Sequence, residues 1–218
     1  MGGIVNRAAT SNHIADRKER SFWLKHLHRW HWISAAVSLV AMLLFAATGI
    51  TLNHAARIES KPKVENRKAQ LPAPLLAQLA QTPREGNQPI PAPLREWLGE
   101  HLPVRAGERL AEWSQDEMVL PLPRPGGDAW VSIDLASGEV EYESTDRGWV
   151  SYFNDLHKGR NTGEAWSWFI DIFAIASLVF GISGLFLLHL YSENRPYTWP
   201  LVSLGVLIPV LLAILFIH

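Results

Sequence analysis

The sequence predicts a membrane protein of mainly α class, with three transmembrane helices and a small α+β domain between the first and the second. Three apolar runs support this prediction, at residues 32–53, 165–188 and 199–217, and Asp171 is the one acidic or basic residue within them. At roughly 1.5 Å per residue, each run is about 28–36 Å long and matches a hydrocarbon core of ~30 Å. The segment between the first two runs has helical and strand-like patterns, which indicates a folded domain.

The prediction divides the chain into five parts. They are a cytoplasmic tail (1–21), transmembrane helix one (22–55), an α+β domain (56–147), an interfacial segment followed by transmembrane helix two (148–190), and transmembrane helix three (197–217). The lipid bilayer is the partner that the three apolar runs require.

Inside the domain, two stretches predict helices and two predict strands. Residues 72–81 and 93–102 have apolar residues at helical spacing, and each begins near a proline. Residues 129–135 and 139–143 alternate apolar with polar residues, and the sequence Ala-Ser-Gly between them favours a turn. We therefore expect a β-hairpin here.

The basic residues predict the orientation in the membrane. Residues 1–30 hold six basic and two acidic residues, a net charge of +4, and positive flanks stay in the cytoplasm. Residues 55–164 hold 13 basic and 17 acidic residues, a net charge of −4, so we expect this segment outside. Strong basicity is absent, which argues against nucleic acid as a partner.

The chain contains no cysteine. Disulfides, thiolate metal sites, iron–sulfur clusters and the covalent attachment of c-type haem are therefore excluded. Any haem must be held without a covalent bond to the protein.

Two apolar runs end in the same pattern, which is the most informative feature of the sequence. TGITLNH (48–54) and SGLFLLH (183–189) both fit [ST]-G-[IL]-x-L-x-H. Upstream, each unit also contains Leu-His followed by a basic residue, at His28 and at His157. The two units cross the membrane in opposite directions, so they form an inverted repeat.

The inverted repeat predicts two histidines at each side of the membrane. We expect His28 and His189 at the inner interface, and His54 and His157 at the outer one. His31 lies three residues after His28 on the same helical face and competes with it for the inner role.

Facing imidazoles in an apolar slot predict two b-type haems, each held by two histidines. The couples are His54 with His157, and His28 or His31 with His189. Gly49 and Gly184 make the helices thin near these positions, so a flat macrocycle or another helix can approach. Zinc is a weaker alternative because a site made only of histidines usually needs a third ligand. The plainest alternative is that these histidines lie among lipid headgroups without a cofactor.

Asp171 is the one carboxylate within a predicted span. Such groups are costly in a membrane and suggest function. A hydrogen-bonded structural role, a proton-handling role and orientation of a ligand imidazole all remain open for it. The role of His218 is also open, and the sequence identifies no catalytic residue.

Several motifs resemble the PepSY-associated transmembrane proteins of bacterial inner membranes. The similar stretches are LHRW (27–30), TGITLNH, DLHKGR (155–160), SGLFLLH and, in the domain, SIDLASGEVEYE (132–143). The resemblance implies a PepSY-like domain (56–147) within a periplasmic segment (56–164), an N-terminus in the cytoplasm, and a multi-pass protein of the inner membrane. Several larger relatives are haem b ferric or ferric-siderophore reductases, which implies a related activity, but this chain is shorter than they are.

Three functional hypotheses follow. The first is a di-haem electron-transfer protein that takes electrons from a cytoplasmic flavoprotein or quinol and passes them to a periplasmic acceptor, such as ferric iron or a ferric siderophore. The second is a haem-free anchored protein whose domain binds a protein or peptide. The third is a transport subunit, which would need a homo-oligomer or a partner membrane subunit to form a path.

Overall fold

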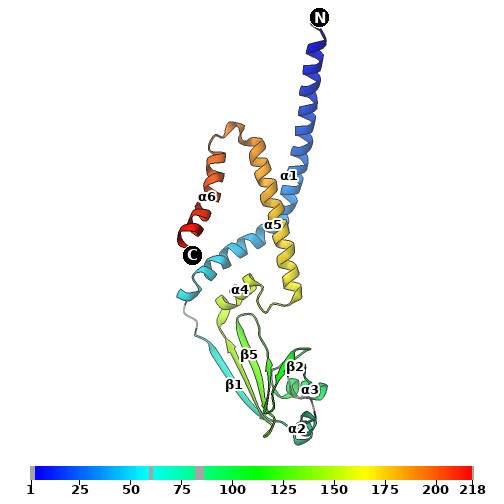
Figure 1. Cartoon of the computed structure of the whole chain (residues 1–218), viewed down its shortest axis with the longest axis vertical. Coiled ribbons are helices and arrows are strands. Elements are labelled where there is room, and N and C mark those ends of the chain that lie inside the picture. Colours follow the sequence, from blue (N-terminus) through cyan, green and yellow to red (C-terminus); the bar gives the residue numbers. More distant parts are fainter. Residues whose placement is uncertain (1–2, 59–60, 82–85, 218) are drawn as a thin grey trace. The chain divides into compact units, whose positions relative to one another are not determined.

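The computed structural model describes residues 3–58, 61–81 and 86–217, with side chains omitted at 3–17 and at Asn194. Two compact units divide the chain: Met1–Leu44 with Phe169–His218, and Phe45–Trp168. Figure 1 traces the course of the chain through both units.

The first unit consists of apolar helices. It contains most of α1 (Gly3–Asn53), most of α5 (Glu164–Tyr191), a short 3₁₀ turn η2 (Ser192–Asn194) and α6 (Thr198–Phe216). Three described segments are long and apolar enough to cross a membrane: Lys18–Asn53, Glu164–Tyr191 and Thr198–Phe216. Their side chains are largely exposed because lipid, and not protein, covers a membrane span. The chain is therefore a multi-pass membrane protein.

The second unit is built on one antiparallel sheet. Its strands are β1 (Lys63–Gln70), β2 (Gly86–Pro89), β3 (Leu110–Trp113), β4 (Glu117–Pro121), β5 (Gly127–Asp134) and β6 (Glu139–Asp146), in the order β1-β6-β5-β4-β3-β2. The remaining elements are the 3₁₀ turn η1 (Ala55–Arg57), α2 (Ala73–Leu79), α3 (Ala92–His101) and α4 (Gly148–Lys158). Strands β1 and β2 form the two edges of the sheet.

Alternation of side chains explains the core of this unit. Along β4, β5 and β6 every second residue is buried, so one face of the sheet is apolar. Leu79 from α2 and Leu94 and Leu98 from α3 are fully buried in the same core cluster as Val131 and Ile133. The two helices each begin at a proline, which fits the first turn of a helix because its missing N–H has no helical partner there.

The predicted fold class is wrong in its account of the domain. The apolar helices come first and last in the chain, and the second unit is built on a six-stranded antiparallel sheet, not on the single hairpin that we expected. Strand makes up 20% of the chain against 60% helix. The expected hairpin is present as β5 and β6, but it is the centre of a larger sheet. The edge strand β1 (KVENRKAQ) was missed because nearly all of its residues are exposed and polar, so it has no apolar alternation.

Candidate functional site: two histidine cradles

The five predicted ligand histidines fall into two groups by burial. His31 and His157 are half-buried, whereas His28, His54 and His189 are exposed. Each half-buried imidazole packs against the [ST]-G pair of the other repeat unit, and we call each such arrangement a cradle.

The Ser183 cradle consists of Phe180, Ser183 and Gly184 on α5, and it receives His31 from α1. The His31 Nδ1 atom lies 3.1 Å from the Ser183 hydroxyl oxygen and 3.2 Å from the Phe180 carbonyl oxygen. The His31 ring stacks on the Phe180 ring, with centroids 4.5 Å apart. A Cβ atom on Gly184 would lie only 3.3 Å from the imidazole Cε1 atom, so glycine makes this approach possible.

The Thr48 cradle has the same composition and lies in the second unit. Phe45, Thr48 and Gly49 on α1 receive His157 from α4. The His157 Nδ1 atom is 2.7 Å from the Thr48 hydroxyl oxygen, and the rings of His157 and Phe45 are 4.9 Å apart. A Cβ atom on Gly49 would lie 3.6 Å from the imidazole Cε1 atom, an ordinary contact distance.

Both cradles determine which imidazole nitrogen carries the proton. The Ser183 hydroxyl donates to the Phe180 carbonyl, and the Thr48 hydroxyl donates to the Phe45 carbonyl, both at 3.1 Å. Each hydroxyl has then used its proton, so it accepts one from the imidazole. With each hydroxyl oriented toward its carbonyl, Nδ1 is the protonated nitrogen in His31 and His157, and Nε2 keeps a lone pair suited to binding a metal.

The cradles extend the internal repeat by one residue type that sequence reasoning missed. Phe45 and Phe180 each precede their hydroxyl residue by three positions, so both units read F-x-x-[ST]-G. The sequence contained this signal, but phenylalanine is common in apolar spans and does not stand out without the ring contacts. The geometry also separates two candidates that the sequence left open, because His31 and not His28 enters the Ser183 cradle.

The exposed histidines have less distinctive surroundings. His28 and His54 bond through Nδ1 to the carbonyl four residues earlier in their own helix, at 2.8 and 3.0 Å. His26 and His101, which were never candidates, do the same, so this bond is no evidence for a ligand. The His189 ring is 5.7 Å from the Trp199 ring. The two bis-histidine couples stay predictions.

Asp171 is exposed on α5. The hydrogen bonds of His31 and His157 go to hydroxyl and carbonyl oxygens, not to this carboxylate. Its role as an orienting partner stays a prediction. His218 lies outside the described residues.

A pocket of about 670 Å³ opens beside His31. Glycine and leucine residues form most of its wall, and Tyr191 and Arg195 also line it. His189 lies in a different pocket of about 460 Å³, with Arg20 and Trp23. Among the described residues, no three histidine, cysteine or acidic side chains come together as a metal site would require, so the zinc alternative has no support from the geometry.

The comparisons with known proteins identify a family. A family model described as PepSY_TM-like matches residues 22–218, which is nearly the whole chain. No curated protein and no solved structure matches it. The repeat motifs, the sheet domain and nearly all of the three apolar spans lie within the matched range, and the chain belongs to the PepSY_TM-like family.

Proposed function

We propose that this protein binds haem b in its membrane helices and transfers electrons across a bacterial inner membrane. The observation that carries the proposal is the pair of cradles, because each fixes an imidazole with its Nε2 lone pair available. In the proposal the N-terminus is cytoplasmic and residues 56–164 are periplasmic. His31 serves the inner site, and His157 serves the outer site. The internal repeat assigns His189 and His54 as their second ligands, although His189 lines a different pocket from His31.

The pocket beside His31 supports this proposal. Its volume of about 670 Å³ lies within the range of small-molecule and cofactor sites, roughly 300–1,000 Å³. Glycine and leucine residues provide an apolar surface for a macrocycle, and Arg195 provides a cation for the carboxylates at its edge. Arg195 is therefore a binding residue in the proposal that the sequence alone did not suggest.

When bound, the haem iron would supply the one-electron redox chemistry. The residues of the chain bind and orient the group. Ser183 and Thr48 hold the imidazoles in one tautomer, and the apolar helix surfaces keep water from the pocket walls. The donor in this proposal is a cytoplasmic flavoprotein or a quinol. The acceptor is ferric iron or a ferric chelate such as a siderophore, on the side of the sheet domain.

The test is a reduced-minus-oxidised absorption spectrum of the full chain, purified after expression with ample haem. We expect a b-type spectrum with two haems per chain, of which His31→Ala and His157→Ala each remove about half. His101→Ala is the control because His101 lies outside both cradles, in the sheet domain, where its Nδ1 bonds to the Trp97 carbonyl of its own helix. Oxidation of the reduced protein by ferric chelates then tests the acceptor. A colourless wild type, or full haem in both cradle variants, would contradict the proposal.

A haem-free role is the second candidate, and one observation favours it. Both cradle histidines already pack between elements of their own unit, so the cradles could serve only to lock helices together. The sheet domain would then bind a periplasmic protein or peptide. A colourless wild type whose thermal stability falls in His31→Ala and His157→Ala would support this role.

A further inference from the structure

Helix α4 has two faces that are held by protein. On one face, Asn154 accepts a hydrogen bond of 2.9 Å from the Thr51 hydroxyl of α1, and His157 enters the Thr48 cradle. On another, the Asp155 carboxylate accepts a hydrogen bond of 2.8 Å from the backbone N–H of Gly126, in the turn between β4 and β5. A Cβ atom on Gly126 would lie 2.8 Å from the Tyr152 Cβ atom, so the turn presses directly against the helix.

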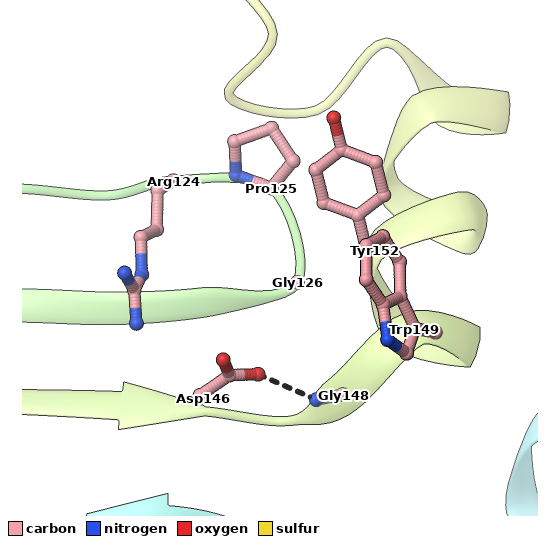
Figure 2. Close-up of a pocket in the computed structure, with 7 residues that line it drawn as sticks. All are labelled: Arg124, Pro125, Gly126, Asp146, Gly148, Trp149 and Tyr152. Atoms are coloured by element: carbon pink, nitrogen blue, oxygen red, sulfur yellow. Dashed lines mark hydrogen bonds between the residues drawn. The ribbon is translucent and has the colours of Figure 1, made fainter.

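The third face of α4 is aromatic and uncovered. Trp149 is 76% exposed, Phe153 is 46% exposed and Tyr152 is 36% exposed. The three rings contact one another, with centroids 5.7–6.3 Å apart. Figure 2 shows Trp149 and Tyr152 projecting from α4 beside the turn that contains Arg124 and Gly126. An exposed aromatic cluster of this kind indicates an interaction surface.

The chain connects this surface to the membrane at both sides. Thr48 and Thr51 belong to the last turns of the span Lys18–Asn53. After α4, five residues lead to Glu164, where the next span begins. Five residues can cover at most roughly 20 Å. Helix α4 is therefore tied to the ends of two apolar spans.

We propose that the face formed by Trp149, Tyr152 and Phe153 lies in the phospholipid headgroup region of the leaflet next to the sheet domain. Tryptophan and tyrosine favour this region because their rings are apolar and their N–H and O–H groups are polar. A recess of about 470 Å³ lies between this face and the turn, and Arg124 lines it. Arg124 is exposed, and its guanidinium, which donates to the Ser144 hydroxyl at 3.0 Å, suits a lipid phosphate. Helix α4 then lies in the membrane plane and holds the β4–β5 turn at the lipid surface.

The experiment uses the natural absence of cysteine in the chain. Trp149→Cys and Phe153→Cys are each labelled with a nitroxide in the full protein, in lipid nanodiscs that hold one copy. Glu96→Cys, at an exposed position of α3, is the matched control. Power-saturation spectroscopy then compares collisions with oxygen, which dissolves in lipid, and with a nickel chelate, which stays in water.

We expect labels at 149 and 153 to favour oxygen over the nickel chelate by several-fold relative to the label at 96. Equal accessibility of all three labels to the nickel chelate overturns the proposal, because the face then lies in water. Protection from both reagents also overturns it, because protein and not lipid then covers the face. Circular dichroism of each variant checks that the sheet domain remains folded.

Discussion

The two cradles have the same residue types but hold their histidines differently. His31 has two oxygen acceptors, at 3.1 and 3.2 Å. A Cβ atom added to its cradle glycine, Gly184, would lie only 3.3 Å from the imidazole ring. His157 has one shorter bond of 2.7 Å and a looser glycine. His157 also belongs to α4, which is bonded to the sheet domain, whereas His31 lies in the apolar helical unit. The comparison teaches that one motif can make a tight, self-contained site and a looser one that depends on a neighbouring domain.

The largest expected effect is that of Gly126→Ala, which should disturb the Thr48 cradle alone. Gly126 has a φ of +74°, which costs another residue roughly 1–2 kcal/mol, and the added Cβ meets Tyr152 at 2.8 Å, which costs roughly 1–3 kcal/mol more. We expect a loss of about 2–5 kcal/mol in the unfolding free energy of the sheet domain, measured by urea denaturation in detergent. The nitrogen NMR chemical shifts of the His157 imidazole should change, and those of the His31 imidazole should stay constant. If the chemical shifts of both imidazoles changed, the Ser183 cradle would not be independent of the sheet domain, which would contradict this prediction.

Removal of the cradle hydroxyls should have the next largest effect, and a greater one at Thr48. Thr48→Val removes the hydroxyl that accepts from the His157 Nδ1–H, which is the one acceptor recorded for it in the described part of the chain. We expect the free energy of unfolding to fall by roughly 1–3 kcal/mol. Ser183→Ala should cost less, roughly 0.5–1.5 kcal/mol, because the Phe180 carbonyl still accepts from His31. Thermal unfolding in detergent measures both, and Thr48→Ser is the control that keeps the hydroxyl. Equal losses in the two variants would show that the second acceptor is unimportant.

Substitution of the cradle glycines should destabilise the Ser183 cradle more than the Thr48 cradle, which is the reverse of the order expected for the hydroxyls. Gly184→Ala puts a methyl group 3.3 Å from a ring that two hydrogen bonds hold in place, so we expect a loss of about 1 kcal/mol or more. Gly49→Ala meets its ring at 3.6 Å, and alanine is favoured over glycine within a helix by roughly 0.5–1 kcal/mol. It should therefore be neutral or stabilising in the same thermal assay. Destabilisation by Gly49→Ala would mean that the two cradles are equally tight.

The smallest effect is expected from Asp134, which lies in the sheet and serves as a reference away from both cradles. The Ser137 backbone N–H and hydroxyl donate to its carboxylate, which lowers the pKa of Asp134 below its ordinary value of 3.8. A group whose pKa is lowered by folding stabilises the protein above its unfolded pKa, and this contribution is lost as the pH falls through the folded pKa. Between about pH 5 and pH 3 the wild type should lose slightly more stability than Asp134→Asn. The imidazole spectra should be identical in both proteins.

Sequence patterns predicted the parts of the molecule that have strong periodicity. The three apolar helices and the β5–β6 hairpin follow directly from hydropathy and alternation. Strands β2 (GNQP) and β3 (LAEW) were missed because four residues are too few for a period to stand out. The structure was also needed to show that His31 contacts Ser183, since His28 and His31 lie on one helical face. Which of the two is the inner ligand stays a prediction.

The exposed edge strand β1 has a further consequence for how the domain behaves among other proteins. Its outer side offers a row of unpaired backbone groups to any passing extended chain. Lysine, arginine and glutamate residues occupy four of its eight positions, at 63, 65, 67 and 68. Lys68 also forms ion pairs with Glu139 and Glu141 of β6. An incoming strand would have to displace this hydrated charge. The opposite edge, β2, is short and ends in proline, which has no N–H to offer. The sheet is thus protected at both ends against unintended growth into larger assemblies.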